Sequence, residues 1–422
     1  MSIKVDQEAF YRRMGRIYSA WKVIYFRNLS MRPKWKKCLF QDDDSELAKL
    51  DALVCVVGTD DEVVYSKSTS LQTWLLGYEL SDTLILMAEK SVYFLASKKK
   101  IEFLKQLESN KNPDVPSVKF LQRDKSDNDK KNFEKIQELL KDSKKGKTMG
   151  IFAKDKDFPG AVMEGFKKIM DKFETEDMSN PLAYIMAAKD ESEVSLVKKA
   201  CQTTIDVFSK HLKEQIMDII DGDKKIKHSK ISEGIEHAIS DKKYNPNIDV
   251  SQVDLCYPAI IQSGGNYKLK FSHQSDKETV HFGAIICAYG ARYKSYCSNI
   301  ARTFLVNPSE KIQSIYNLLV EAEEHILSQL KEGTKMCDVY NSAVKFVKKE
   351  NPDLVEKLTK NFGFVMGVEF REASLSLAPN CEAVIKKGMV FNVNIGFQGK
   401  FFISFEDFAL VLVKLAFKGE VT

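Results

Sequence analysis

Strand-like and helix-like segments alternate through the first 177 residues, and this alternation constrains the fold more than any other feature of the sequence. DALVCVVG (51–58) is a short β-branched run, and TLILMAEKSVYFLAS (83–97) is typical of two strands that turn at Glu89-Lys90. KKKIEFLKQLE (98–108) and NFEKIQELLKDSKKGK (132–147) place apolar residues on one helical face. Interleaved strands and helices predict an α/β domain over residues 1–177.

The pattern changes after residue 177. AAKDESEVSLVKKACQTTIDVFSKHLKEQIMDIID (187–221) predicts a long amphipathic helix, and strand-rich sequence follows from Cys256 to Phe304. Helical periodicity covers 312–333 and 336–350, and β signals return in 389–413. Antiparallel strands with helices against one side make an α+β domain, which we expect over residues 178–422.

Composition agrees with two globular domains. A chain of 422 residues exceeds what one hydrophobic core usually supports, and its 44% hydrophobic and 29% charged residues are ordinary for a globular protein. No run of about 18 uncharged apolar residues is present, and the charged N-terminal sequence does not match a signal peptide, which predicts a cytosolic or nuclear protein. Eight cysteines without a C-x-x-C pair indicate buried free thiols rather than zinc ligands or disulfides. A net charge of +5 gives no electrostatic argument for a nucleic-acid or membrane partner.

The segment from Val23 to Gln41 has no clean period and is rich in basic residues. It is interpreted as a basic surface insertion, with a partner-binding arm as the alternative. Lysine-rich stretches beside the helices, such as 98–100, are interpreted as solvated faces.

The hairpin GAIICAYGARYKSYCSNIARTF (283–304), with the segments around Gly363, Gly396 and Glu406, resembles the pita-bread fold of methionine aminopeptidase, aminopeptidase P, prolidase and creatinase. The last three enzymes carry a smaller α/β domain before it, which matches the order expected here. Active peptidases of this fold hold two divalent metal ions with two aspartates, one histidine and two glutamates. The metal ions activate a water molecule as the nucleophile.

Aligned with those motifs, four of the five metal-ligand positions are substituted. The two aspartate positions fall on Ala288 and Asn299, the histidine position on Phe364, and one glutamate position on Asn394. Only Glu406 keeps the ligand residue type. None of the six histidines lies beyond residue 325, so no small shift of the alignment restores the missing one. The resemblance therefore implies a peptidase fold without metal, other cofactor or catalytic residues.

Two substrate-binding histidines of the peptidases are also replaced, by Phe271 and Arg371. The frame glycines, such as Gly290 and Gly363, are kept. Either the fold is retained as a binding scaffold, or these glycines serve only turns and close packing.

Several longer motifs narrow the resemblance. TSLQTWLLGYELSDT, IIQSGGNYKLKFS, NFGFVMGVEFRE and KKGMVFNVNIGF resemble the N-terminal module of the large subunit of the FACT complex, a nuclear histone chaperone. This implies a location in the nucleus, on the chromosome, and a role in nucleosome reorganisation during transcription, replication and DNA repair. The implied partners are histones or histone tails, and chromatin or replication factors, with no membrane. An HMG-box small subunit would be reached through regions outside this chain.

Three functions remain to be compared. The first is a non-catalytic binding module whose former substrate cleft persists as a groove, lined by Phe271, Arg302, Phe364, Arg371, Asn394 and Glu406. The second is an active metal-dependent aminopeptidase with an unusual site around Glu406. The third is a nucleic-acid binder that uses its lysine clusters.

Overall fold

The chain forms two compact units, residues 1–186 and 187–422. The computed structural model describes residues 4–22, 42–59, 65–109, 112–155, 159–265, 267–268, 270–400, 407–417 and 420–421. Helix α7 (Ser179–Ala187) lies almost wholly in the first unit, whereas the boundary expected from the sequence, after residue 177, precedes this helix. Each unit is described separately below.

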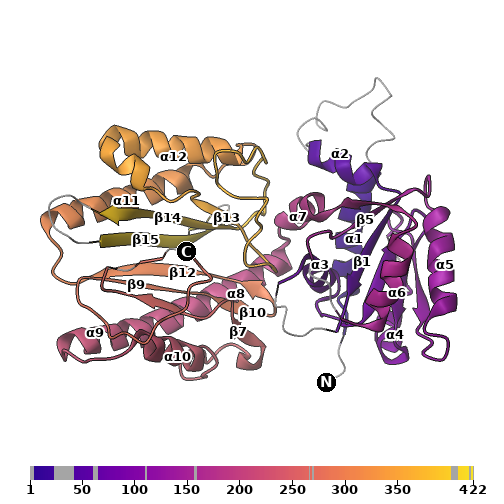
Figure 1. The fold of residues 1–422 in the computed structure, drawn as a ribbon, viewed down its shortest axis with the longest axis horizontal. Coiled ribbons are helices and arrows are strands. Elements are labelled where there is room, and N and C mark those ends of the chain that lie inside the picture. The colour runs from indigo at the N-terminus through magenta and orange to yellow at the C-terminus, as the bar shows by residue number, and fades with distance from the viewer. Residues whose placement is uncertain are drawn as a thin grey trace. The chain divides into compact units, whose positions relative to one another are not determined.

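The first unit is built on a six-stranded mixed sheet with helices on both faces (Figure 1). Its strands are β1 (Ala52–Val57), β2 (Thr83–Met87), β3 (Ser91–Ala96), β4 (Ser117–Gln122), β5 (Thr148–Ile151) and β6 (Glu174–Asp177). Its other helices are α1 (Gln7–Trp21), α2 (Asp42–Lys49), α3 (Lys67–Leu76), α4 (Lys98–Leu104), α5 (Lys130–Lys141) and α6 (Ala161–Met170). The strand order is β4-β3-β2-β1-β5-β6, with parallel pairs at both ends and the antiparallel strand β2 between β1 and β3. The expected α/β architecture is confirmed.

The central strands read as continuous apolar runs because both of their faces are covered. Every residue of β1, β2 and β3 is buried. On one face, Ile136 of α5 and Val162 of α6 belong to the same core cluster as the strand residues. On the other face, Phe94 of β3 meets Phe10 of α1, with ring centroids 6.4 Å apart.

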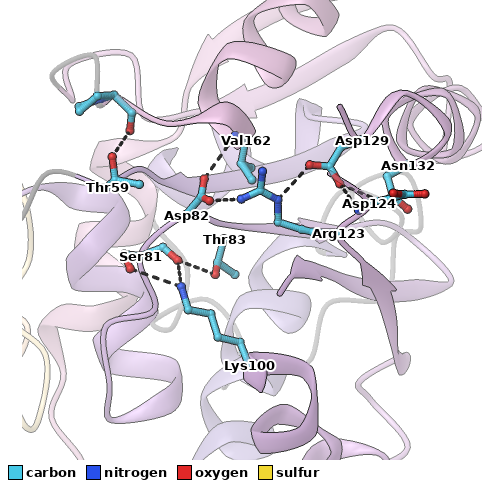
Figure 2. A network of polar contacts seen from close by, with 11 residues as sticks. Thr59, Ser81, Asp82, Thr83, Lys100, Arg123, Asp124, Asp129, Asn132 and Val162 are labelled. Carbon is cyan, nitrogen blue, oxygen red and sulfur yellow. Dashed lines mark hydrogen bonds and ion pairs between the residues drawn. The ribbon is translucent and has the colours of Figure 1, made fainter. Parts of the chain in front are cut away.

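A buried ionic network joins loop ends of this unit (Figure 2). The Arg123 guanidinium, directly after β4, contacts Asp82 ahead of β2, and its Nε donates to Asp129 Oδ2 at 2.9 Å. Asp129 also accepts from the backbone N–H of Asp124 at 2.7 Å, and Asp82 accepts from the backbone N–H of Val162 at 3.3 Å. The Arg123 and Asp129 side chains are only 8% and 2% exposed. Loss of either partner would therefore leave a buried charge without compensation.

We expect Arg123→Ala to lower the free energy of unfolding of the first unit by about 3 kcal/mol, because Asp129 loses its ionic partner. All three tryptophans, at positions 21, 35 and 74, lie in this unit, so tryptophan fluorescence during urea unfolding reports on it alone. Lys135→Ala breaks an exposed pair with Glu138 and serves as the control, with an expected change below about 0.5 kcal/mol. Equal changes in the two variants would contradict a structural role for the network.

The second unit contains a seven-stranded sheet whose pairings are all antiparallel within the described residues. Its order is β13-β14-β15-β12-β9-β8, with β16 on β15, and β11-β10-β7 forms a separate small sheet. The strands are β7 (Val253–Leu255), β8 (Ile260–Gln262), β9 (Ala284–Tyr289), β10 (Ala291–Tyr293), β11 (Tyr296–Cys297), β12 (Ile300–Leu305), β13 (Gly363–Val365), β14 (Phe391–Lys400), β15 (Asp407–Phe417) and β16 (Glu420–Val421). The predicted α+β architecture is confirmed.

Two groups of helices flank this sheet (Figure 1). They are α8 (Glu191–Val207), α9 (Lys213–Asp221), α10 (His228–Ile239), α11 (Glu310–Gln329) and α12 (Met336–Glu350). The long helix predicted over 187–221 begins at Glu191, because Asp190 and Glu193 form a reciprocal capping box. A π-helical turn at Phe208–Leu212 separates α8 from α9.

Three further predictions concern membrane-spanning helices, the cysteines and the segment from Val23 to Gln41. Among the described helices, none combines the length and the apolar character needed to cross a bilayer. The seven cysteines in the described part of the chain are free thiols, and five of them are buried. The segment from Val23 to Gln41 lies outside the described residues, so both of its interpretations stay predictions.

Candidate functional site

Side-chain alternation along β9 and β12 defines the two faces of the sheet at the candidate site. On β9, Cys287 and Tyr289 belong to a core cluster with residues of α9 and α10. Ala288, between them, therefore points to the opposite face. It pairs with Ala301 of β12, and both residues line a hollow on that face. The β9 position that the motif alignment gives to an aspartate ligand thus holds a methyl group that faces the hollow.

This hollow continues into a groove with a volume of ≈ 1060 Å³. Its walls come from the segment after β8, the chain between α12 and β13, the segment after β13, and β14. The residues that line it are Lys268, Lys270, Phe271, Ser272, Glu356, Lys357, Leu358, Thr359, Lys360, Asn361, Phe364, Phe370, Arg371, Asn394 and Gln398.

Three phenylalanines pack together at Phe364, the position that the motif alignment gives to a histidine ligand. Phe364 of β13 lies with its ring centroid 5.9 Å from that of Phe271 and 5.6 Å from that of Phe370, both in edge-to-face arrangements. Phe271 and Phe370 are 5.0 Å apart. Phe364 is 1% exposed, whereas Phe271 is half-buried and offers part of its ring to the groove. The floor of the groove is therefore aromatic and apolar.

Arg371 contacts Phe364. The exposed Arg371 guanidinium lies over the Phe364 ring, 5.4 Å from its centroid, which is a cation–π geometry. The arginine therefore covers the aromatic floor from the solvent side and keeps its charge at the rim.

Asn299, which the motif alignment places at the second aspartate position, is connected to the aromatic cluster through Tyr257. It is 5% exposed, and the Tyr257 hydroxyl donates to its Oδ1 at 2.5 Å. The Tyr257 ring packs on Phe271 and Phe370, with centroids 5.2 and 5.0 Å away, and burial raises the pKa of its hydroxyl well above the ordinary value. Tyr257 thus links Asn299 to the floor of the groove.

The residues at these positions do not fit a binuclear metal site. Ala288 and Phe364 carry no donor atom, and Asn299 and Asn394 offer neutral amides where two dications need anionic oxygens. Across the described residues, no three His, Cys, Asp or Glu side chains lie close enough together to hold a metal ion. Glu406 lies outside the described residues.

Four of the six predicted groove residues line the same concavity: Phe271, Phe364, Arg371 and Asn394. Arg302 is not among the residues that line it, because it pairs with Cys287 on the helix-covered face of β9. There its charge opposes the burial that raises the pKa of Tyr316 in α11. The placement of Arg302 in the groove was therefore wrong, and that of Glu406 stays a prediction.

The sequence-based prediction missed several residues that shape the groove. They are Tyr257, Lys268, Lys270, Lys360 and Phe370. Lys268 and Lys270 stand in one of the motifs that carry the family resemblance, IIQSGGNYKLKFS, which was a signal for their importance. Tyr257 and Phe370 are distant in sequence from their contacts, and no local pattern marks them.

A polar cluster around the buried His228 holds the groove wall that contains Lys268 and Lys270. His228, at the start of α10, bonds through Nδ1 to Asp276 at 2.6 Å and through Nε2 to Ser263 at 2.7 Å. Burial alone would raise the pKa of Asp276, but the bond from His228, the backbone N–H of Glu278 and the nearby His228 and His273 rings together lower it below its ordinary value. The Ser263 hydroxyl also accepts the backbone N–H of His281 at 2.8 Å and is 8% exposed. The cluster therefore clamps both ends of the wall segment to α10.

The frame glycines follow from backbone geometry. A Cβ atom at Gly290 would lie 2.0 Å from the carbonyl oxygen of Ser298. At Gly363, φ is +140° and a Cβ atom would lie 2.3 Å from the carbonyl oxygen of Asn392. Both positions need glycine whatever chemistry stands beside them.

Two family models match the chain, one in each unit. The model described as FACT complex subunit SPT16 N-terminal lobe domain matches residues 5–181, and the model of metallopeptidase family M24 matches residues 195–414. The solved N-terminal domain of FACT complex subunit SPT16 from chickpea (Cicer arietinum) is 31% identical, with a TM-score of 0.86 over 99% of this chain and 96% of that one. The chain belongs to the SPT16 family. The family resemblance seen in the motifs is confirmed, and so is the peptidase-like fold.

The chain matches only part of the length of a curated SPT16-family relative. FACT complex subunit spt-16 from Caenorhabditis briggsae is 33% identical over 401 residues, which cover 93% of this chain but only 36% of that protein. A solved Xaa-Pro dipeptidase from Bacillus anthracis is 18% identical, with a TM-score of 0.68 over 98% of this chain and 97% of that one. That likeness establishes the peptidase fold alone.

Removal of the central ring tests the aromatic floor of this SPT16-family groove. Phe364→Ala should lower the free energy of unfolding of the second unit by about 3 kcal/mol, because it leaves a cavity between Phe271 and Phe370. Hydrogen–deuterium exchange of β13 and β14 under native conditions measures the loss. Phe282→Ala is the control, since Phe282 is 42% exposed, and its effect should stay within about 0.5 kcal/mol. Unchanged protection of β13 in Phe364→Ala would contradict this packing.

The clamp on the groove wall has its own test. His228→Ala removes the bonds to Ser263 and Asp276, so amide exchange in residues 263–281 should accelerate by at least about tenfold while β12 stays protected. His237→Ala, at an exposed position of the same helix, should leave that exchange unchanged. If the two variants exchange alike, the segment is held by other contacts.

Proposed function

We propose that the chain is a non-catalytic, aminopeptidase-like binding module of an SPT16-family subunit, which binds histones or other chromatin proteins during nucleosome reorganisation. The observation that supports the non-catalytic part of this proposal is the aromatic floor, where Phe364 and its two partner rings leave no donor atom at the position that the motif alignment gives to a histidine ligand. A fold that keeps its architecture around a site without metal-binding side chains retains a shaped surface for partners. Transcription, replication and DNA repair are the processes in which such a subunit would act, in the nucleus and on the chromosome.

Family membership supports the choice of partners. The named relatives are FACT complex subunits, so other subunits and chromatin are the surroundings in which this module would work. Histones or histone tails are the proposed ligands, with chromatin or replication factors as further candidates. An HMG-box small subunit is proposed to bind through regions outside this chain. The chain spans 36% of the length of its Caenorhabditis briggsae relative.

The enzymatic alternative is disfavoured by chemistry at the site. A water-activating metal pair needs anionic ligands, and the former ligand positions Ala288, Asn299, Phe364 and Asn394 carry none. The nucleic-acid alternative rests on lysine clusters such as 98–100 and finds no support in a net charge of +5.

Histone binding is tested with the 422-residue chain as it stands. We expect it to bind core histone dimers or tetramers at physiological salt in a sedimentation or fluorescence titration, with weaker binding when the tails are removed. Serum albumin at equal concentration is the control. Absence of binding to both histone complexes would overturn histones as the ligand.

Peptidase activity is tested separately. Purified chain that is supplied with Mn²⁺, Co²⁺ or Zn²⁺ should hold no stoichiometric metal in the second unit and should release no N-terminal residue from Xaa-Pro peptides. Prolidase treated in parallel is the positive control. Stoichiometric metal together with peptide cleavage would refute the non-catalytic role.

A further inference from the structure

The rim of the groove is cationic. Among the described lining residues, the charged side chains are Lys268, Lys270, Lys357, Lys360, Arg371 and a single acid, Glu356. Lys268, Lys270, Lys360 and Arg371 are exposed, so their charges stand at the mouth while the phenylalanines lie beneath. Such a concentration of one sign contrasts with the nearly balanced charge of the whole chain, which has 64 basic and 59 acidic residues.

Three of these lysines have no ionic partner among the described residues. Within the part of the chain that the structure describes, Lys268, Lys270 and Lys360 form no ion pair, whereas helix lysines such as Lys135 and Lys230 each bond a glutamate three residues away. Like charges that gather around a concavity repel one another, and a ligand of opposite sign relieves this repulsion. The groove therefore favours an anionic occupant by charge complementarity.

Two features inside the groove define the rest of the ligand. The half-buried ring of Phe271 and the side chain of Leu358 offer an apolar surface between the cationic walls. Asn394 also lines the groove, and its buried Nδ2 has no hydrogen-bond partner among the described residues, so a small side-chain movement would make it a donor for a carbonyl or carboxylate oxygen. The volume of ≈ 1060 Å³ lies at the upper end of small-ligand pockets, which suits several peptide residues rather than one metabolite.

We propose that this groove binds an acidic peptide segment of a protein partner, with a bulky apolar side chain seated on Phe271 and flanking carboxylates paired with Lys268, Lys270, Lys360 and Arg371. The proposal rests on the use of this unit as a binding module and names the chemistry of one ligand of that site. A basic histone tail would bring like charge to the same rim, so histones bind elsewhere on the module. Acidic and basic partners then occupy different surfaces.

The test uses a fluorescently labelled peptide of alternating Asp, Glu and Leu residues, titrated with the 422-residue chain by anisotropy. Binding should weaken at least about tenfold in Lys268→Glu/Lys270→Glu, since two attractive contacts become repulsive. The matched control is Lys213→Glu/Lys224→Glu, two exposed lysines of the same unit that do not line the groove. The control should bind the peptide like the unmodified chain, and circular dichroism establishes that both variants are folded.

Three other ligands test the specificity of the groove for charge, for an apolar side chain and against nucleic acid. A peptide with Lys in place of Asp and Glu should not bind, and one with Ala in place of Leu should bind about tenfold more weakly because it loses its apolar contact. Single-stranded DNA should not compete with the peptide. Failure of the acidic peptide to bind, equal losses in the groove and control variants, indifference to the leucines, or displacement by DNA would each overturn the proposal.

Histone binding, measured on the same variants, separates this proposal from the function on which it rests. Retained histone binding in Lys268→Glu/Lys270→Glu is the expected result. Acidic-peptide binding without any histone binding would remove the histone proposal and leave this one standing. Histone binding that is lost in the groove variant but kept in the control would place histones in the groove and overturn the acidic ligand.

Discussion

The antiparallel pairing of β9 with β12 is the constraint on which the rest of the site depends. It sets Ala288 opposite Ala301 and turns both toward the groove, and it sends Cys287 and Arg302 to the helix-covered face. A shift by one residue would exchange the two sets, so the apolar contacts of Cys287 and Tyr289 with α9 and α10 hold the register. The side chains that line the groove are not needed for core packing, because the helix-covered face of the same strands provides it.

Much of the fold could be predicted from the sequence because its signals are local. The strand at 51–58 and the hairpin around Glu89-Lys90 form as expected, since β-branched runs and turn residues act over a few positions. The long helix of 187–221 was predicted as continuous, but a π-helical turn interrupts it at Phe208–Leu212. That turn depends on tertiary packing, which no window of sequence contains.

The site was predicted less completely. Phe271, Phe364, Arg371 and Asn394 come together as expected because the family motifs fix their places on the scaffold. The predicted placement of Arg302 in the groove did not hold. Arg302 follows the groove-facing Ala301, and neighbouring strand residues point to opposite faces. The aromatic contacts of Tyr257 and Phe370 join segments far apart in the chain, so a single sequence does not reveal them.

The close backbone approaches at Gly290 and Gly363 have a consequence for how proteins of this fold are classified. Since a Cβ atom would collide with Ser298 or Asn392 backbone in either case, the fold itself requires these glycines, whatever residues stand beside them. A motif search weighted toward glycines therefore detects the backbone architecture and carries no information about metal ligands. In this superfamily, glycine spacing diagnoses architecture, and only the carboxylates and imidazole between the glycines diagnose chemistry.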